Sequence, residues 1–278
     1  MIVAVMSPHT SHNGNTITAS LLALGLGSMN KKVLLTHSNA ISQSFYTYFG
    51  LEQYEDKTTT PTQLVKLLRE GAIQPEAISD YCKEVTDGVF VFTNNKTNFS
   101  DNDMYEFSDF IMQLSDYDFI IYDINNLETP TATEVLKNAD VVIMNLTQSI
   151  LELQEFSAMK ESLMKRCKNK QVILVCNKYS GIAGKQKDIS KMINEKADSN
   201  VIHYNPWIQY ACNNGKLLDL YKTIKGKGDK LIELDKDILR LATLVSKAKI
   251  MVSKQRLNKG SSSSTTGKAT KDGGAVND

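Results

Sequence analysis

The first eighteen residues constrain the fold of this chain more than any other stretch. Residues 2–6 are an apolar run with the length of a buried strand, a polar loop covers residues 7–15, and residues 17–26 form an apolar stretch with the length of a helix. Backbone N–H groups at such a helix start point outward, and the helix dipole favours an anion there. This order of strand, polar loop and helix start is therefore typical of a phosphate-binding site.

The loop differs from a working P-loop, whose pattern is G-x-x-x-x-G-K-[ST]. Its last three positions hold Gly14, Asn15 and Thr16, so an asparagine stands where the lysine should be, and His9 occupies the first glycine position. Gly14 lets the backbone approach a ligand closely, and Thr16 is placed where its hydroxyl can reach Mg²⁺. The alternative is an ordinary turn before a capped helix, with no ligand.

Composition and charge exclude several classes of protein. Of 278 residues, 41% are hydrophobic and 23% are charged, which is typical of a soluble globular protein. The net charge of +1 gives no overall bias toward nucleic acid or membrane. The four cysteines contain no C-x-x-C pair, which favours reduced thiols and a cytoplasmic location. No apolar run approaches the ~20 residues of a membrane-spanning helix, so no transmembrane segment is expected.

Short apolar runs alternate with helix-sized segments along most of the chain. Strands are expected at residues 2–6, 33–35, 89–92, 117–122, 141–146, 172–176 and 201–203. Helices are expected at residues 17–26, 41–49, from about 60, 101–114, 131–139, 149–166 and 188–196, with 214–224 irregular to helical. Strands without polar alternation predict an α/β fold: a doubly wound, mostly parallel sheet of about seven strands with helices on both faces, over residues 1–228.

Polar residues follow several of these strands, at the edge where ligands of such sheets bind. Asp123 comes after the apolar run FIIY, where a carboxylate can hold Mg²⁺ through water next to Thr16. Its alternative role is to cap the helix expected from residue 131. Asn177 closes ILVCN, where its amide can either contact a purine edge or form a turn.

Six segments, taken in order, match the pattern of one known family. They are GNTITASLLALGL, KKVLLTHSNAISQSFYTYFGL, YDFIIYDINN, LKNADVVIMNLTQSILEL, VILVCNKYSG and NPWIQYACNNGKLL. Their order and spacing resemble the ParA/MinD type of deviant P-loop ATPases, which partition plasmids and chromosomes and position cell-division and pilus machinery. The resemblance extends from Met1 to about Ile224.

The resemblance implies a set of site residues and a ligand. Gly14, Thr16, Asp123 and Asn177 match the family's pattern. The nucleotide-binding residues implied are Thr10, Ser11, Asn13, Gly14, Asn15, Thr16, Ile17 and Asn177, and the metal ligands implied are Thr16 and Asp123. The expected ligand is ATP or ADP with Mg²⁺, and the alternative is a cradle that binds none.

The departures from the family pattern concern charge. The family's two P-loop lysines correspond to Thr10 and Asn15, and its Asp-x-Asp after the second strand corresponds to His37 and Asn39. Phosphoryl transfer depends on positioning and on electrostatic stabilisation of the transferred group. We therefore assign no catalytic residue and expect hydrolysis to be weak or absent. Loss of the early lysine also removes the contact that reaches across the dimer in this family.

The C-terminal part has a different pattern. Residues 229–257 are expected to form an amphipathic helix, whose apolar positions are Leu231, Leu234, Ile238, Leu241, Val245, Ala248 and Val252. This helix either docks on the sheet or pairs with a partner or a membrane surface. Residues 258–278 are rich in Gly, Ser and Thr and are expected to be a disordered tail. From residue 247 onward there are seven Lys/Arg and two Asp, so nonspecific contact with DNA or an anionic lipid surface is an option.

These features predict a ParA/MinD-like protein with a degenerate Walker motif, acting in spatial positioning or partition of DNA, pilus, secretion or other machinery. It is expected to form a homodimer or to bind a protein partner through the C-terminal helix. One alternative is an active partition ATPase that binds DNA nonspecifically. The other is a nucleotide-free adaptor that acts through that helix.

Overall fold

A single eight-stranded sheet forms the centre of the protein. The computed structural model describes residues 1–8, 13–40, 42, 44–51, 61–92, 99–183, 185–193, 200–226 and 232–262. The strands are β1 (Ile2–Met6), β2 (Val33–His37), β3 (Lys83–Thr86), β4 (Val89–Val91), β5 (Phe119–Asp123), β6 (Val141–Leu146), β7 (Gln171–Tyr179) and β8 (Asn200–His203). Their order in the sheet is β3-β4-β2-β5-β1-β6-β7-β8. Every pairing is parallel except that of β3 with β4, which confirms the predicted mostly parallel sheet.

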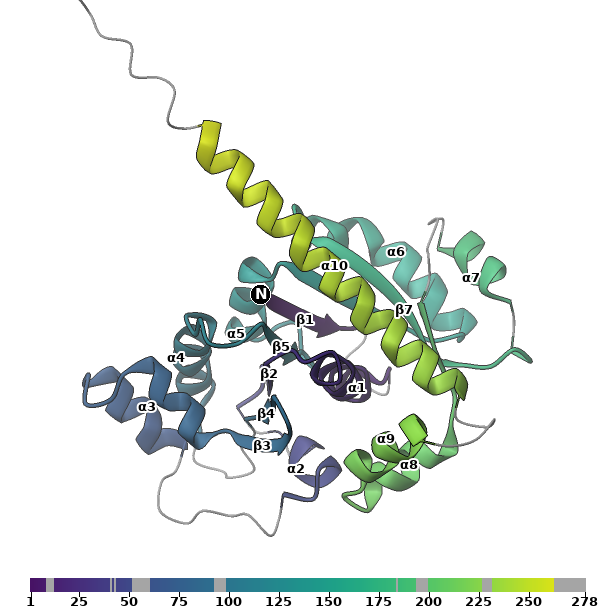
Figure 1. Ribbon diagram of the computed structural model, residues 1–278. Coiled ribbons are helices and arrows are strands. Elements are labelled where there is room, and N and C mark those ends of the chain that lie inside the picture. Colours follow the sequence, from purple (N-terminus) through teal and green to yellow (C-terminus); the bar gives the residue numbers. More distant parts are fainter. Residues whose placement is uncertain are drawn as a thin grey trace, which may run out of the picture.

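Helices cover both faces of the sheet (Figure 1). They are α1 (Asn15–Gly27), α2 (Ser44–Tyr48), α3 (Pro61–Arg69), the 3₁₀ helix η2 (Pro75–Tyr81), α4 (Asp101–Met112), α5 (Pro130–Asn138), α6 (Ile150–Arg166), α7 (Gln186–Met192), α8 (Pro206–Asn213), α9 (Leu217–Gly226) and α10 (Ile232–Ser262). Among the described residues, no helix is both long and apolar enough to cross a membrane.

The apolar strands divide the core into two layers. In β1, Val3 and Val5 belong to the cluster that includes α1 and α10, whereas Ala4 and Met6 belong to the cluster formed with α4, α5 and α6. Successive side chains of a strand point to opposite faces, so a strand covered on both faces must be apolar throughout. This is the physical reason that the unbroken apolar runs predicted a doubly wound sheet.

Several boundaries differ from those expected. The sequence pattern does not predict β3, η2 or α8, and α9 is a regular helix where the pattern predicts partly irregular structure. The helix expected over residues 188–196 is α7, which is capped at Ile193. The C-terminal helix does not end at residue 257 but continues to Ser262. Each residue added to a formed helix gains a hydrogen bond, so a long helix extends past weak helix formers. Residues 263–278 of the expected tail lie outside the described residues.

The C-terminal helix docks on the sheet side that carries α1. Its apolar residues Leu234, Ile238, Leu241, Val245 and Ala248 are buried. At Gly25 the two helices approach so closely that an added Cβ would lie 2.8 Å from Ile238 Cγ2. Farther along, Lys249 Nζ donates a 2.6 Å hydrogen bond to Asp118 Oδ1, at the start of β5. The docked arrangement expected as one alternative therefore holds for the first half of α10, and its C-terminal end projects beyond the body (Figure 1).

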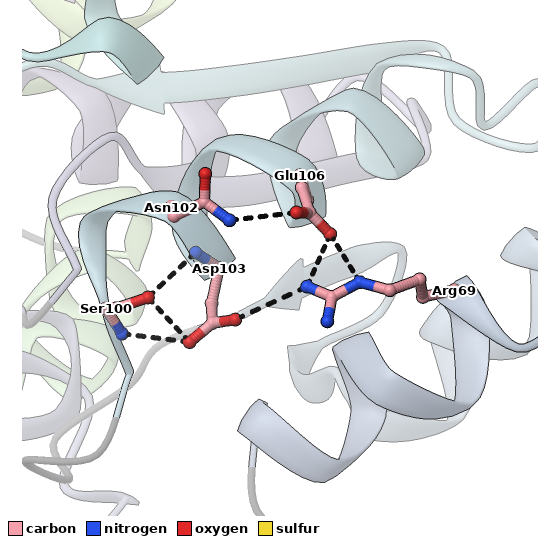
Figure 2. A network of polar contacts seen from close by, with 5 residues as sticks. All are labelled: Arg69, Ser100, Asn102, Asp103 and Glu106. Atoms are coloured by element: carbon pink, nitrogen blue, oxygen red, sulfur yellow. Dashed lines mark hydrogen bonds and ion pairs between the residues drawn. The ribbon is translucent and has the colours of Figure 1, made fainter.

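A separate polar network ties α3 to α4 (Figure 2). Arg69 donates two hydrogen bonds to Glu106 Oε2, of 2.9 and 2.7 Å, and lies 3.7 Å from Asp103. Ser100 and Asp103 form a capping box at the start of α4. Exposed pairs of this kind contribute little to stability, so the network links the two helices without anchoring the fold.

Candidate functional site

A cavity of about 400 Å³ opens at the carboxyl edge of the sheet. It is bounded by the start of α1, by the ends of β7 and β8, and by α8. The predicted residues Asn13, Gly14, Asn15, Thr16, Ile17 and Asn177 all line it. Thr10, Ser11 and His9 lie outside the described residues. The strand, loop and helix of the N-terminus thus meet the end of β7 in one concave site.

Gly14 is required where the chain enters α1. Its φ of 79° is left-handed, a conformation that side-chain-bearing residues rarely adopt. In addition, a Cβ at this position would collide with the carboxamide of Asn177. Helix α1 begins at the next residue, Asn15. The left-handed turn and the close approach of β7 together explain why only glycine fits here.

Asn15, which the sequence pattern aligns with the P-loop lysine, bonds to three partners. Its Nδ2 donates to Ser7 Oγ at 3.2 Å and to the carbonyl oxygen of Ile124 at 3.1 Å. Its Oδ1 accepts a 2.9 Å hydrogen bond from Asn145 Nδ2. The side chain is buried, so these partners replace lost contacts with water. Asn15 therefore fixes the loop to β5 and β6 and brings no positive charge to the site.

The network continues from Asn145 to β7. Thr18 Oγ1 donates to Asn145 Oδ1 at 3.1 Å and accepts a 2.8 Å hydrogen bond from Asn177 Nδ2. Asn177 Nδ2 also donates to the Gly14 carbonyl at 3.2 Å, and its Oδ1 accepts from the Lys178 backbone N–H at 2.7 Å. The two N–H groups of Asn177 are thus used within the protein. Sequence analysis missed Asn145, whose only signal is one polar residue in the apolar run VVIMNL.

Thr16 and Asp123 meet as predicted for a metal site. Thr16 Oγ1 donates a 2.7 Å hydrogen bond to Asp123 Oδ2, and Asn125 Nδ2 donates to the same oxygen at 2.9 Å. Burial raises the pKa of Asp123 to about 6, although these two hydrogen bonds act in the opposite direction. Asp123 does not cap α5, because Thr129 does. Within the described residues its Oδ1 has no hydrogen-bond partner.

This arrangement suits a hard divalent cation bound partly through water. A hydroxyl and a carboxylate lie side by side, and one buried carboxylate oxygen is left without a partner among the described residues. Searching the same residues finds no cluster of three or more His, Cys, Asp or Glu that would form an all-protein metal cage. The donors present therefore fit Mg²⁺ that accompanies a phosphate ligand.

His37 lies beside Asp123 at the end of the neighbouring strand. The two residues are paired in register between β2 and β5. His37 is fully buried, and its Nδ1 donates a 2.7 Å hydrogen bond to the Asn39 carbonyl. Burial lowers the pKa of His37 to about 4. The imidazole is therefore neutral at pH 7 and adds no charge beside Asp123.

Asn13 gives the cavity a polar group that the described protein does not use. Its side chain is 3% exposed and lines the cavity. Among the described residues, neither its Nδ2 nor its Oδ1 has a hydrogen-bond partner. Burying such a group without a partner costs about 1–3 kcal/mol, and a ligand phosphate at the start of α1 would supply one.

Comparison with known proteins shows the fold. The sequence matches no protein-family model and no curated protein at a significant level. Several solved structures share its architecture. The septum site-determining protein MinD of Pyrococcus horikoshii OT3, solved with Mg-ADP, has a TM-score of 0.66 at 18% identity, over 88% of this chain and 96% of that chain. A ParA-family ATPase of Chlorobium tepidum TLS has a TM-score of 0.65 at 14% identity, over 87% and 98%.

A third structure extends the comparison to a complex. In the MinC:MinD cell-division complex of Aquifex aeolicus, the matched chain has a TM-score of 0.65 at 14% identity, over 89% of this chain and 96% of that chain. All three matches cover nearly the whole of the compared chain. The protein therefore has the ParA/MinD-type fold that the order of its sequence segments predicts.

Proposed function

We propose that this protein is a ParA/MinD-like positioning or partition protein that binds ATP or ADP with Mg²⁺ and hydrolyses ATP slowly or not at all. The observation that carries the proposal is the bonding of Asn15. At the position of the P-loop lysine, a neutral amide is held by Ser7, Ile124 and Asn145. The cradle is therefore rigid but uncharged at this point.

Binding of a nucleotide is supported by the groups that face the cavity. The start of α1 lines the cavity, where the first N–H groups of a helix favour an anion, and Asn13 has no side-chain partner among the described residues. Thr16 and Asp123 would hold Mg²⁺ beside the phosphates. When bound, the ion would neutralise phosphate charge.

Slow hydrolysis follows from the groups that the site lacks. A lysine at residue 15 and a carboxylate at residue 37 would stabilise the transferred phosphoryl group and orient water, and the chain has an amide and a neutral imidazole there. Removing one such electrostatic group typically lowers kcat by about 10²–10³. Losing both leaves binding without efficient turnover, which suits a scaffold gated by nucleotide occupancy.

Two measurements on the full chain test the proposal. A nucleotide at about 100 times its Kd adds roughly 2.7 kcal/mol of stability, so Mg-ATP or Mg-ADP should raise Tm by about 5–10 °C. Asp123→Ala should lose most of the shift that Mg²⁺ adds, whereas Asn213→Ala, at an exposed cavity position, should keep it. Phosphate release should stay at background in wild type. Release above background that Asp123→Ala abolishes would show an active ATPase instead.

The projecting end of α10 supports a contact surface. Residues 251–259 contain three Lys/Arg and no Asp or Glu, and the helix continues beyond the packed body to Ser262. We propose that this end contacts an anionic surface or a protein partner in the cytoplasm, in a homodimer or a mixed complex. Co-sedimentation with phosphatidylserine vesicles and with duplex DNA, with and without residues 251–278, separates these options. If truncation changes neither, this part of the proposal fails.

A further inference from the structure

His203, at the end of β8, is a cavity residue whose ring is held from α10. It lines the cavity, and its side chain is 31% exposed. Asp237 Oδ2 accepts hydrogen bonds from His203 Nδ1 at 2.7 Å and from the His203 backbone N–H at 2.9 Å. The Asp237 side chain is only 4% exposed. Because a carboxylate oxygen accepts, Nδ1 carries the proton, and the ring nitrogen left for another partner is Nε2.

The ring is also fixed by its other neighbours. Tyr179 packs edge-on against it, with centroids 5.2 Å apart. Arg240 donates a 2.9 Å hydrogen bond to the second oxygen of Asp237, so a cation already accompanies this carboxylate. When the imidazole is neutral and carries its proton at Nδ1, Nε2 is a hydrogen-bond acceptor. A histidine held in this way presents one acceptor in a set orientation.

His203 offers the cavity an acceptor at a place where Asn177 is already used within the protein. The amide expected to contact a base donates both of its N–H groups to Gly14 and Thr18, and its oxygen accepts from Lys178. His203 lies on the neighbouring strand and lines the same cavity. A ligand that offers a donor group, such as an amino or hydroxyl group of a nucleoside, would find its acceptor there.

We infer that His203 Nε2 accepts a hydrogen bond from a donor group of the nucleotide bound in this cavity, and that Asp237 of α10 is the positioning residue that fixes the tautomer of His203. The inference rests on the proposed function, since it assigns a contact to the same ligand. It also links the cavity to the C-terminal helix. Because coupling between two equilibria is reciprocal, a nucleotide that bonds to His203 stabilises the docked position of α10, and undocking of α10 lowers the affinity for the nucleotide.

The test is ¹⁵N NMR of the imidazole rings in the full chain, with His203 assigned by comparison with His203→Ala. Wild-type His203 should show the Nδ1–H tautomer, and its Nε2 resonance should move on saturation with Mg-ATP. Asp237→Asn should shift the ring toward the Nε2–H tautomer and weaken binding about tenfold, the effect of one lost hydrogen bond. Arg240→Met is the matched control. It removes the ion pair to Asp237 but should leave tautomer and affinity within about twofold.

Two nucleotide analogues identify the donor. Inosine triphosphate lacks the amino group of adenine, and 2′,3′-dideoxy-ATP lacks the ribose hydroxyls. The analogue that lacks the donor should bind wild type about tenfold more weakly than ATP does. Its affinity should not fall further in His203→Ala, because the contact is already absent. If both analogues bind wild type as tightly as ATP does, the inference is overturned.

Further outcomes separate this inference from the proposed function. Nucleotide binding seen as a thermal shift, with an unmoved Nε2 resonance or an Nε2–H tautomer in wild type, overturns the inference alone. If Asp237→Asn does not fold, His203→Ala still decides the matter through its affinity. No binding of any nucleotide to wild type overturns both.

Discussion

The two walls of the cavity are built on different principles. Behind the first wall, formed by the start of α1 and the end of β7, four buried side chains bond to one another: Asn15, Asn145, Thr18 and Asn177. The second wall, formed by the end of β8 and by α8, belongs to a segment with exposed aromatic residues, of which Tyr204 lines the cavity. These are Tyr204, Trp207 and Tyr210, with exposed fractions of 58%, 59% and 53%. The first wall is backed by polar side chains that bond to one another, and the second keeps apolar surface in contact with water.

The difference shows where stability and binding free energy reside. Buried amides stabilise only if all their partners are present, so the first wall is sensitive to any single change. Exposed aromatic rings contribute little until something covers them. The first wall therefore determines the shape of the cavity, and the second wall, formed by β8 and α8, is the one that can adapt to a ligand or partner.

The largest expected effect comes from breaking the first wall at Asn145. Asn145→Leu leaves Asn15 Oδ1 and the Thr18 hydroxyl buried without this partner, at about 1–3 kcal/mol each. We expect a loss of about 3 kcal/mol in the free energy of unfolding, measured by urea denaturation. Asn213→Leu, on the opposite wall and exposed, should change it by less than about 0.5 kcal/mol. Equal losses in the two variants would show that the walls do not differ.

The next effect depends on pH and on the pair formed by His37 and Asp123. The lowered pKa of His37 makes the folded state bind a proton less well, so stability falls as pH drops from about 6.5 toward about 4. The raised pKa of Asp123 acts oppositely, since stability rises as pH drops through about 6 toward about 3.8. Between about pH 7.5 and 5 these two changes in stability are about −2 and about +1 kcal/mol, so they largely offset each other.

Asp123→Asn removes the compensating titration. Between about pH 7.5 and 5, the free energy of unfolding of the variant should fall by about 2 kcal/mol. In the wild type, His37 and Asp123 together should lower it by less than about 1 kcal/mol over the same range. Urea denaturation at both pH values measures the difference between the two proteins. A variant whose stability follows the wild-type pH profile would mean that the two buried groups do not oppose each other.

A smaller effect is expected at the exposed aromatic residues of α8. Trp207 is mostly exposed and packs edge-on against Tyr210, with centroids 5.9 Å apart. Trp207→Ala should lower the free energy of unfolding by less than about 1 kcal/mol. Phe107→Ala, at a fully buried position of α4, should cost about 3–5 kcal/mol. A large loss at Trp207 would indicate that this residue belongs to the folded core.

The smallest effect concerns thiol reactivity and leaves stability unchanged. Burial raises the pKa of Cys176, beside Asn177, and of Cys212, on α8, to about 12 each. Both should resist iodoacetamide at about pH 8, because the thiolate is the reactive form. If the α8 wall opens more readily, Cys212 is labelled before Cys176, as mass spectrometry of digested protein would show. If Cys176 is labelled first, the wall formed by α1 and β7 is the more mobile of the two.

Local patterns in the sequence determined the layered sheet, the cradle at Gly14 and the meeting of Thr16 with Asp123. Each of these follows from apolar runs and from polar residues at strand ends, which a short window of sequence contains. Their approach in space then follows from parallel strands that end at the same edge.

Only the tertiary structure decided which partners hold Asn15 and His203. Asn15 and Asn145 are 130 residues apart, and His203 and Asp237 come from different elements. No local period relates these pairs, because the sequence around a polar residue in an apolar strand is the same whether or not a neighbouring strand supplies its hydrogen-bond partner. Strand β3 and helix α8 were missed for the same reason: their short sequences carry weak signals, and it is their packing against neighbouring elements that makes them regular.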